Sequence, residues 1–528
     1  MRRSKTLKDL ATRSIITKLC THLKGGGHNL AKLPACLRES LLLELVKRRS
    51  NKQYGEEQKR NLPLTMRKAV SLLISSETKK FEFGGLLSYT KRNNVLRNTF
   101  KILQILTRAP NLEHLIINVK EKFENHHYPL LEERSIQAIS RMENLKILKI
   151  IEFAVKYDDM KSICKVLKKL QYVEFFHIDF SDTRLEDLGA DIEDFKSSFS
   201  RLTVILFESA RVMLCPFERK LKRLCLQNLP NLKIIYKCQD YTNFDSPLEE
   251  SLIPVEPCVL RHLCISPSTS DLPSVFPEVT NLHVRFPRNE ITDEDKLKSI
   301  LRFSSIECLL LNFPPTFSIF ERVIGAYGAN LHTLIIIAVE ITDGESPSFS
   351  RIFASCPKLQ KLVLSGVDIS DYKKPIDTFA PLREFEWTPY DTGLQTFEVT
   401  NILSALPNLE KITLSDLESL EVDDLKKLAS NIKENKILGK LTEIKLIFPV
   451  CGHFESDDDR VLLRAVRDII ANAVAYLPAL VDIELYLGYR LNSLYQDQIR
   501  KIGEKFQELI GDDSIVKFIR TIENRKIG

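Results

Sequence analysis

The chain has 528 residues, 44% of them hydrophobic and 28% charged, and its formal net charge is +6. This is the composition of a soluble, folded protein. No window approaches the ~18 consecutive uncharged apolar residues that a membrane-spanning helix needs, so we predict no membrane partner. The basic N-terminus lacks the apolar core of a secretory signal, although its Arg and Ser content leaves a mitochondrial presequence as an alternative.

The charge is distributed unevenly along the chain. Residues 1–110 contain 24 Lys and Arg against 7 Asp and Glu, whereas residues 111–528 contain 52 against 63. The head therefore carries a net charge of +17 and the body −11. A basic head predicts an acidic partner, either nucleic acid or an acidic protein, unless it is simply a solvated surface.

The cysteines indicate the compartment. There are eleven, an odd number, and none forms a C-x-x-C pair. Most lie within apolar runs, which predicts buried thiols rather than a disulfide frame or a zinc site. We therefore expect an intracellular protein, in the cytoplasm, the nucleus or both.

Two helical segments are predicted within residues 1–47, separated by KGGGHN. Their apolar residues recur at a spacing that places them close to one face of a helix. These residues are Leu7, Leu10, Ile15, Leu19 and Leu23 in the first segment, and Leu33, Leu37, Leu41 and Leu45 in the second. Residues 48–61 are polar and predict a linker, followed by a helical N-terminal cap over residues 62–110.

The first segment resembles a BC-box. That motif begins with Ser, Thr or Pro followed by Leu, with Cys four residues after the Leu and an aliphatic residue four further on. Thr6, Leu7, Ala11 and Ile15 occupy those places, with Ala11 standing where the family has Cys. The resemblance implies binding to an adaptor of the Elongin C type.

The second segment resembles the cullin box that commonly follows a BC-box. In a cullin box, Leu-Pro precedes apolar residues at four-residue steps, and Leu33, Pro34, Leu37 and Leu41 fit that pattern. The same Leu-Pro also opens an F-box, which implies an adaptor of the Skp type. An F-box has an acid two residues after the Pro, where this chain has Cys36. The third alternative is a plain helical cap that shields the first repeat.

From about residue 100 onward, the pattern Leu-x-x-Leu-x-Leu recurs with aliphatic or aromatic substitutes, at a mean period of about 28 residues. The last two positions are two residues apart, so they point to the same side of a short strand. The fourteen copies are Leu112/Leu115/Ile117, Leu145/Leu148/Ile150, Val173/Phe176/Ile178, Leu202/Ile205/Phe207, Leu221/Leu224/Leu226, Leu260/Leu263/Ile265, Val279/Leu282/Val284, Ile306/Leu309/Leu311, Leu331/Leu334/Ile336, Leu359/Leu362/Leu364, Leu382/Phe385/Trp387, Leu409/Ile412/Leu414, Leu441/Ile444/Leu446 and Leu480/Ile483/Leu485.

This pattern resembles the leucine-rich-repeat superfamily, in particular the irregular cytosolic type found in ubiquitin-ligase receptors. Such repeats often follow the strand with Ile-Thr-Asp and a helix, as this chain does from Ile291, Ile341 and, with Ser, Ile369. The Thr or Ser can cap the helix, and the acid suits its first turn. We predict an α/β leucine-rich-repeat solenoid over residues 111–490, whose triplets form one curved parallel sheet, and a C-terminal helical cap over residues 491–528.

No catalytic motif is present: the chain lacks a P-loop, H-E-x-x-H and G-x-S-x-G. We therefore expect a non-enzymatic protein without a cofactor or metal. The resemblance implies a substrate receptor of a cullin–RING ubiquitin ligase, binding an adaptor, a cullin and an unknown substrate protein on the repeats. The alternatives are a scaffold or regulator without ligase association, and a basic-headed nucleic-acid-associated protein, with nucleic acid the less favoured partner. Docking predicts partly exposed Leu37 and Leu41, whereas a cap predicts that both are buried.

Overall fold

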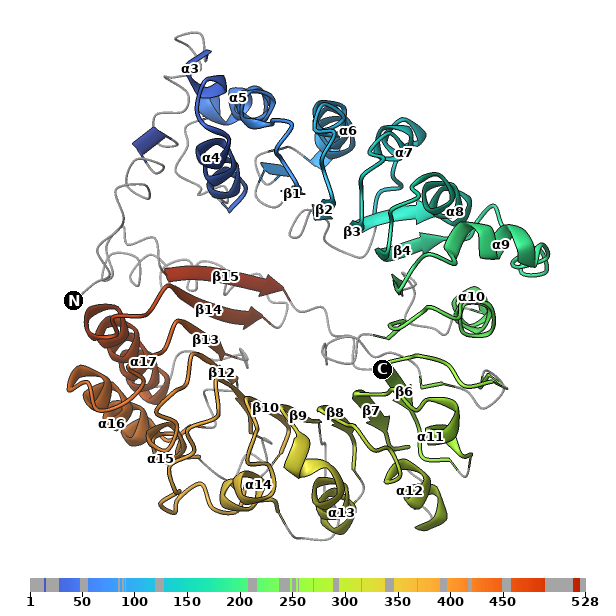
Figure 1. The fold of residues 1–528 in the computed structure, drawn as a ribbon. Helices are drawn as coiled ribbons and strands as arrows, with labels where there is room; N and C mark the ends of the chain where they lie inside the picture. Colours follow the sequence, from blue (N-terminus) through green and yellow to red (C-terminus); the bar gives the residue numbers. More distant parts are fainter. Residues whose placement is uncertain are drawn as a thin grey trace.

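The structure is a computed structural model, and it describes residues 14–15, 28–47, 56–83, 86–87, 90, 92–118, 128–207, 216–236, 247–248, 253–254, 256–268, 270–287, 294–314, 316–337, 346–367, 369–389, 397–415, 420–448, 457–489 and 516–522. Within these residues the chain forms a curved solenoid that bends into a nearly closed ring (Figure 1). Strands line the inner, concave side, and helices form the outer side.

All the strand pairs described are parallel, and they form two sheets. The first contains β1 (Lys80–Glu82), β2 (His114–Asn118), β3 (Ile147–Lys156), β4 (Tyr172–Asp179) and β5 (Val204–Phe207). The second contains β6 (His262–Ile265), β7 (Asn281–Arg285), β8 (Cys308–Asn312), β9 (Thr333–Ile337), β10 (Lys361–Ser365), β11 (Glu384–Thr388), β12 (Lys411–Ser415), β13 (Glu443–Phe448), β14 (Asp482–Tyr489) and β15 (Val516–Ile522).

The helices return the chain between strands on the outer side. They are α3 (His28–Ala31), α4 (Ala35–Lys47), α5 (Glu56–Leu73), α6 (Val95–Leu106), α7 (Glu133–Ser140), α8 (Tyr157–Val166), α9 (Ile192–Phe199), α10 (Pro216–Asn228), α11 (Leu272–Val275), α12 (Glu294–Ile300), α13 (Phe317–Tyr327), α14 (Phe349–Ser355), α15 (Thr400–Ser404), α16 (Val422–Lys433) and α17 (Asp457–Tyr476). None of the described helices combines the length and apolar character needed to cross a membrane.

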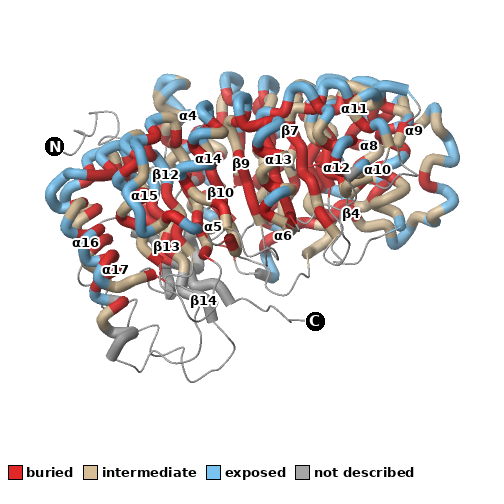
Figure 2. Tube along the Cα trace, turned by 90° about the horizontal axis from the view of Figure 1, so that it is seen from below, coloured by how far each residue is buried: buried red, intermediate tan, exposed pale blue. Residues whose placement is uncertain are grey.

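The core lies in the wall between the strands and the helices, where the buried residues gather in Figure 2. Leu309, Leu334 and Leu362 are paired in register on neighbouring strands, and each is 0% exposed. Burying one leucine contributes about 2 kcal/mol, and no single repeat could do this without its neighbours. Trp387 is also buried, with its ring 5.7 Å from that of Phe349.

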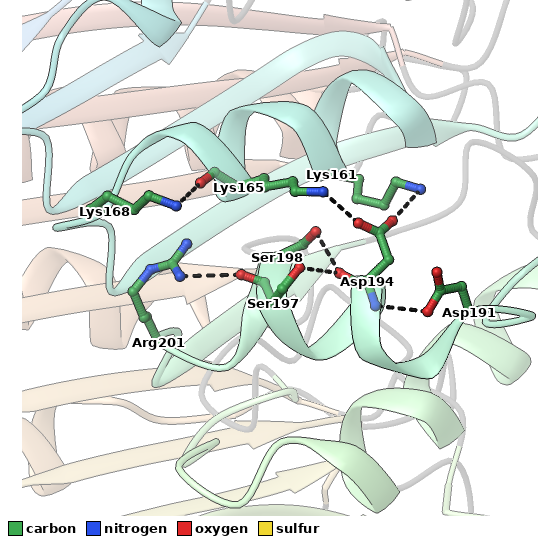
Figure 3. Close-up of polar contacts among 8 residues, drawn as sticks. All are labelled: Lys161, Lys165, Lys168, Asp191, Asp194, Ser197, Ser198 and Arg201. Atoms are coloured by element: carbon green, nitrogen blue, oxygen red, sulfur yellow. Dashed lines mark hydrogen bonds and ion pairs between the residues drawn. The ribbon is translucent and has the colours of Figure 1, made fainter.

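Polar contacts also join the helices of successive repeats. Asp194 of α9 accepts hydrogen bonds from Lys165 and Lys161 of α8 at 2.6 and 3.0 Å (Figure 3). These bonds lower the pKa of the Asp194 carboxyl. Asp191 in turn caps α9 by accepting the N–H of Asp194. Such contacts tie one outer helix to the next.

The prediction of one continuous sheet is wrong, because β5 and β6 are not paired. The triplet Leu221/Leu224/Leu226 lies in α10, because the buried Leu221, Leu224 and Cys225 have the three- and four-residue spacing of one helix face. In its place, Leu232 and Ile235 are buried, and Ile234 forms an isolated parallel bridge with Val204.

The triplet Val173/Phe176/Ile178 is out of register by three residues. Leu148 pairs with Val173 and Ile150 with Phe175, so the repeat consists of Leu170, Val173 and Phe175. Phe176 is only partly buried. The neighbouring aromatic residues at 175 and 176 made both registers compatible with the pattern.

The ends of the solenoid also differ from the prediction. Strand β15 lies within the range predicted as a helical cap and pairs with β14. Strand β1 lies within the predicted helical cap of residues 62–110 and pairs with β2. Helix α5 begins at Glu56, inside the predicted linker.

The motif starting at Ile369 acts differently from the prediction. Asp371 is buried, and its carboxylate accepts the main-chain N–H groups of Phe349 and Ser350 at 2.8 and 3.0 Å. It therefore caps the helix of the preceding repeat, α14, rather than a helix of its own. The motifs starting at Ile291 and Ile341 include residues outside the described part of the chain.

Candidate binding surface on the concave face

The concave surface follows directly from the repeat pattern. Between the last two apolar positions of each triplet lies one residue whose side chain points to the opposite, inner face of the strand. The pairing aligns these residues into a row across the second sheet: Leu310, Ile335, Val363, Glu386, Thr413, Lys445 and Glu484. The row changes from apolar residues to charged residues and one threonine at the step from β10 to β11.

The apolar part of this row forms a small cluster of its own. Leu310, Ile335 and Val363 are each 0% exposed, and Ile337 packs against them. On β6 and β7, the strands that precede β8 in the second sheet, the thiol sulfur of Cys264 lies 3.3 Å from Nδ1 of His283. Both residues are buried. Among the described residues, no three potential metal ligands gather at one place.

Beside the charged part of the row lies a ladder of alternating charges. Nζ of Lys411 lies 3.3 Å from a carboxylate oxygen of Glu443 and 3.7 Å from one of Glu384. Nζ of Lys361 lies 3.5 Å from Glu384. Burial acts to lower the pKa of Lys411, but the two carboxylates outweigh it and raise that pKa. Each of these partly exposed pairs contributes at most about 1 kcal/mol, so the ladder adds little to stability.

The ladder and the charged row together line a hollow of about 220 Å³ over β10–β14. Its floor is the sheet, and Thr413 lies on the central strand, β12. The charged lining consists of three lysines and five acids, a net charge of −2: Lys361, Lys411, Lys445, Glu384, Glu386, Glu443, Asp482 and Glu484. Such a surface can make several charge-assisted hydrogen bonds, and it favours a positively charged partner.

The charged residues of the hollow were not predicted as a site. Their only signal in the sequence is their position between apolar residues of the repeat. The signal does not say which of the fourteen copies form a hollow.

The N-terminal residues predicted to bind an adaptor are only partly described. Thr6, Leu7 and Ala11 lie outside the described residues, whereas Ile15 is half-buried and packs against the core. Pro34 is exposed immediately before α4.

The remaining predicted residues lie at or on α4, which packs against α5. Leu33 and Leu37 are half-buried, but the side chain of Leu41 is only 2% exposed. Leu45 is also buried, while Leu43 is 48% exposed. The face of α4 that carries Leu41 and Leu45 therefore belongs to the core, as a cap requires. Leu37 lies on the same face but is only half-buried, and Leu43 is accessible on another side of the helix.

No protein-family model matches the chain, and no curated protein matches it in sequence. Among solved structures, the chain is similar to one in the Rad7 and Elc1 complex of yeast, with 12% identity and a TM-score of 0.38 over 86% of this chain and 97% of that one. It is also similar to a chain of the TLR13–ssRNA13 complex, with 12% identity and a TM-score of 0.27 over 85% and 63%. A chain of the mouse RP105/MD-1 complex gives 14% identity and a TM-score of 0.29 over 78% and 76%.

These scores are low, and the class of the protein follows from its own geometry. Parallel strands recur at the period of the triplets, with helices on the outer side and a shared core between them. The protein is an α/β leucine-rich-repeat solenoid.

Proposed function

We propose that this solenoid is a non-enzymatic, protein-binding molecule that holds a partner protein in the hollow over β10–β14. The observation that carries the proposal is the concentration of charged side chains on the inner face of five adjacent strands. Because the ion pairs of the ladder contribute little to stability, recognition of a partner is the better explanation of this arrangement. The net charge of −2 suits a partner segment that carries Lys or Arg.

A finer proposal is that the protein is a substrate receptor of a cullin–RING ubiquitin ligase. Leu33 and Pro34 match the start of a cullin box or an F-box, and Leu37 and Leu43 on α4 are accessible. An adaptor of the Elongin C or Skp type would then contact this end of the solenoid. The burial of Leu41 supports the alternative, in which α4 is a cap and the protein is a scaffold without a ligase.

We also propose an intracellular location. Seven cysteines lie in the described part of the chain, and five of them are buried. All seven are thiols rather than half-cystines. Thiols of this kind suit a reducing compartment.

Affinity purification of the tagged full chain, followed by identification of the co-purifying proteins, tests the binding proposal. Thr413→Trp should fill the hollow and reduce recovery of the substrate partner about tenfold, because a bulky ring excludes the bound segment. The control, Lys427→Trp, adds the same ring to an exposed position on α16. Equal recovery of every partner by both variants would rule out the hollow as the binding site.

The same purification tests the ligase proposal separately. Leu37→Asp combined with Leu43→Asp places a carboxylate at each of two accessible leucines of α4, Leu37 at the edge of the core face and Leu43 on another side of the helix. We expect normal thermal melting and loss of the adaptor and the cullin, with the substrate partner retained. If the wild-type chain recovers partners but neither an adaptor nor a cullin, the scaffold alternative is correct.

A further inference from the structure

The outer surface of α5 and α6 carries a compact group of cations. On α6, Arg97 and Lys101 are one helical turn apart, with Arg97 exposed and Lys101 half-exposed. Arg108, in the turn after the helix, extends the same side. Helix α6 contains no acidic residue. This side of α6 therefore carries two cations and no acid, and a third cation follows just after the helix.

Arg67 adds a cation from the neighbouring helix to Arg97 and Lys101. Helix α5 packs against α6, and Nε of Arg67 is buried without a hydrogen-bond partner. The guanidinium of Arg67 is the main cause that lowers the pKa of Lys101, followed by burial and by Arg97. Burial and then Arg97 lower the pKa of Arg67 in turn. The three cations are thus close enough to repel one another.

The chain supplies no counter-charge to this group within the residues that the structure describes. None of Arg67, Arg97 and Lys101 forms an ion pair there, and Glu77 and Glu82 are the acids that lie between Glu57 and Glu113 in the sequence. Between residues 57 and 113 the sequence has those two acids against eleven Lys and Arg. Bringing an anion to the cluster would relieve the repulsion between these cations.

An exposed leucine lies beside the cations. Leu64 precedes Arg67 by three residues on α5, so the two share a side of the helix, and Leu64 is 49% exposed. A nucleic acid is usually held by many phosphate contacts over an area larger than this cluster, and its phosphate backbone does not pack against an apolar side chain. A protein segment offers carboxylates and apolar side chains together.

We propose that Arg67, Arg97 and Lys101, together with Leu64, form a docking surface for an acidic segment of a partner protein that also carries apolar residues. The surface lies on the outer side of the ring, on helices beside the first sheet (Figure 1). It is separate from the hollow over β10–β14 and does not depend on the function proposed for that hollow.

The test is selection of peptides from a random display library on the immobilised full-length chain. We expect enrichment of sequences rich in Asp and Glu with interspersed Leu or Phe. One enriched peptide, synthesised with a fluorophore, is then titrated against the variants by fluorescence anisotropy. The double variant Arg97→Glu/Lys101→Glu should weaken its binding by about tenfold or more, and Arg67→Gln should weaken it by less.

The matched control is Lys427→Glu/Lys433→Glu, which makes the same charge change at two exposed positions on α16. We expect it to alter peptide binding less than about twofold, and circular dichroism should show that every variant is folded. Three results would overturn the proposal. The first is that acidic peptides are not enriched. The second is that the α5–α6 variants and the α16 variant weaken peptide binding equally. The third is that duplex DNA displaces the peptide and binds the Arg97→Glu/Lys101→Glu variant more weakly than the unchanged chain.

Discussion

The carboxylate of Asp424 joins two successive repeats, and its removal tests how the solenoid is held together. Its Oδ2 accepts the main-chain N–H groups of Val399 and Thr400 at 2.6 and 2.9 Å. The hydroxyl of Thr400 donates to the main-chain carbonyl of Asp424 at 3.0 Å. All three residues are buried, and α15 has no side-chain cap from its own repeat. The variant Asp424→Ala therefore leaves two buried donors without an acceptor.

A hydrogen bond to a charged group contributes about 1.5 kcal/mol or more, so we expect Asp424→Ala to cost about 3 kcal/mol of unfolding free energy. Asp424→Asn should cost about half as much, because an amide oxygen can still accept. The neighbouring Asp423 is the control, since its side chain is 83% exposed and pairs with Lys426 in solvent. Asp423→Ala should cost less than about 1 kcal/mol.

Denaturant unfolding of the full chain, followed by circular dichroism, measures these differences. Hydrogen exchange with mass spectrometry locates them, and we expect faster exchange in peptides that cover α15 and α16. Because a solenoid couples mainly neighbouring repeats, exchange in α6 should change little. Equal destabilisation by Asp424→Ala and Asp423→Ala would show that the buried carboxylate does not hold the two repeats together.

Two further predictions concern packing and reactivity. A Cβ on Gly328 would lie 2.3 Å from the carbonyl oxygen of Ser355, so Gly328→Ala should lower stability by about 2 kcal/mol. The Cβ of Gly325→Ala meets open space within α13, so this variant should raise stability by up to about 1 kcal/mol. Thermal melting of both variants checks that the two effects have opposite signs. Burial raises the pKa of the Cys164 thiol to about 12, so at neutral pH it should resist iodoacetamide, while the exposed Cys36 is alkylated. Mass spectrometry of the native chain that finds Cys164 modified first would contradict this burial.

Most of the repeat body could be predicted from the sequence because the strand requires two apolar residues at a spacing of two. Twelve of the fourteen triplets lie where they were expected, for example Leu309 and Leu311 on β8. The prediction failed at Leu221, because Leu221, Leu224 and Cys225 also have the spacing of a helix face and are buried in α10. In both wrong triplets, the local sequence allows two positions for the strand. Pairing with the strand of the preceding repeat determines which residues form it.

The strand β1 was missed because a polar residue occupies its first apolar position. Thr78 is buried there, and its Oγ1 accepts the N–H of Ser75 at 3.0 Å, so a local hydrogen bond satisfies it. The four-residue spacing of Leu37, Leu41 and Leu45 correctly predicted a helix. Which of these leucines is buried depends on contact with α5, whose first turn falls in a polar stretch that carries no strong helical pattern.

The break between the two sheets separates the two proposed surfaces. At the break, the main-chain N–H of Lys233 donates to the carbonyl of Thr203 at 2.8 Å, and the carbonyl of Lys233 accepts the N–H of Arg261 at 2.7 Å. One residue thus continues the main-chain hydrogen bonding from the repeat of β5 to that of β6, while the core remains one cluster. The hollow lies entirely within the second sheet, and the cations of α5 and α6 lie beside the first. Each surface is therefore complete on its own side, and the repeat that contains Lys233 sets how their two partners are placed relative to each other.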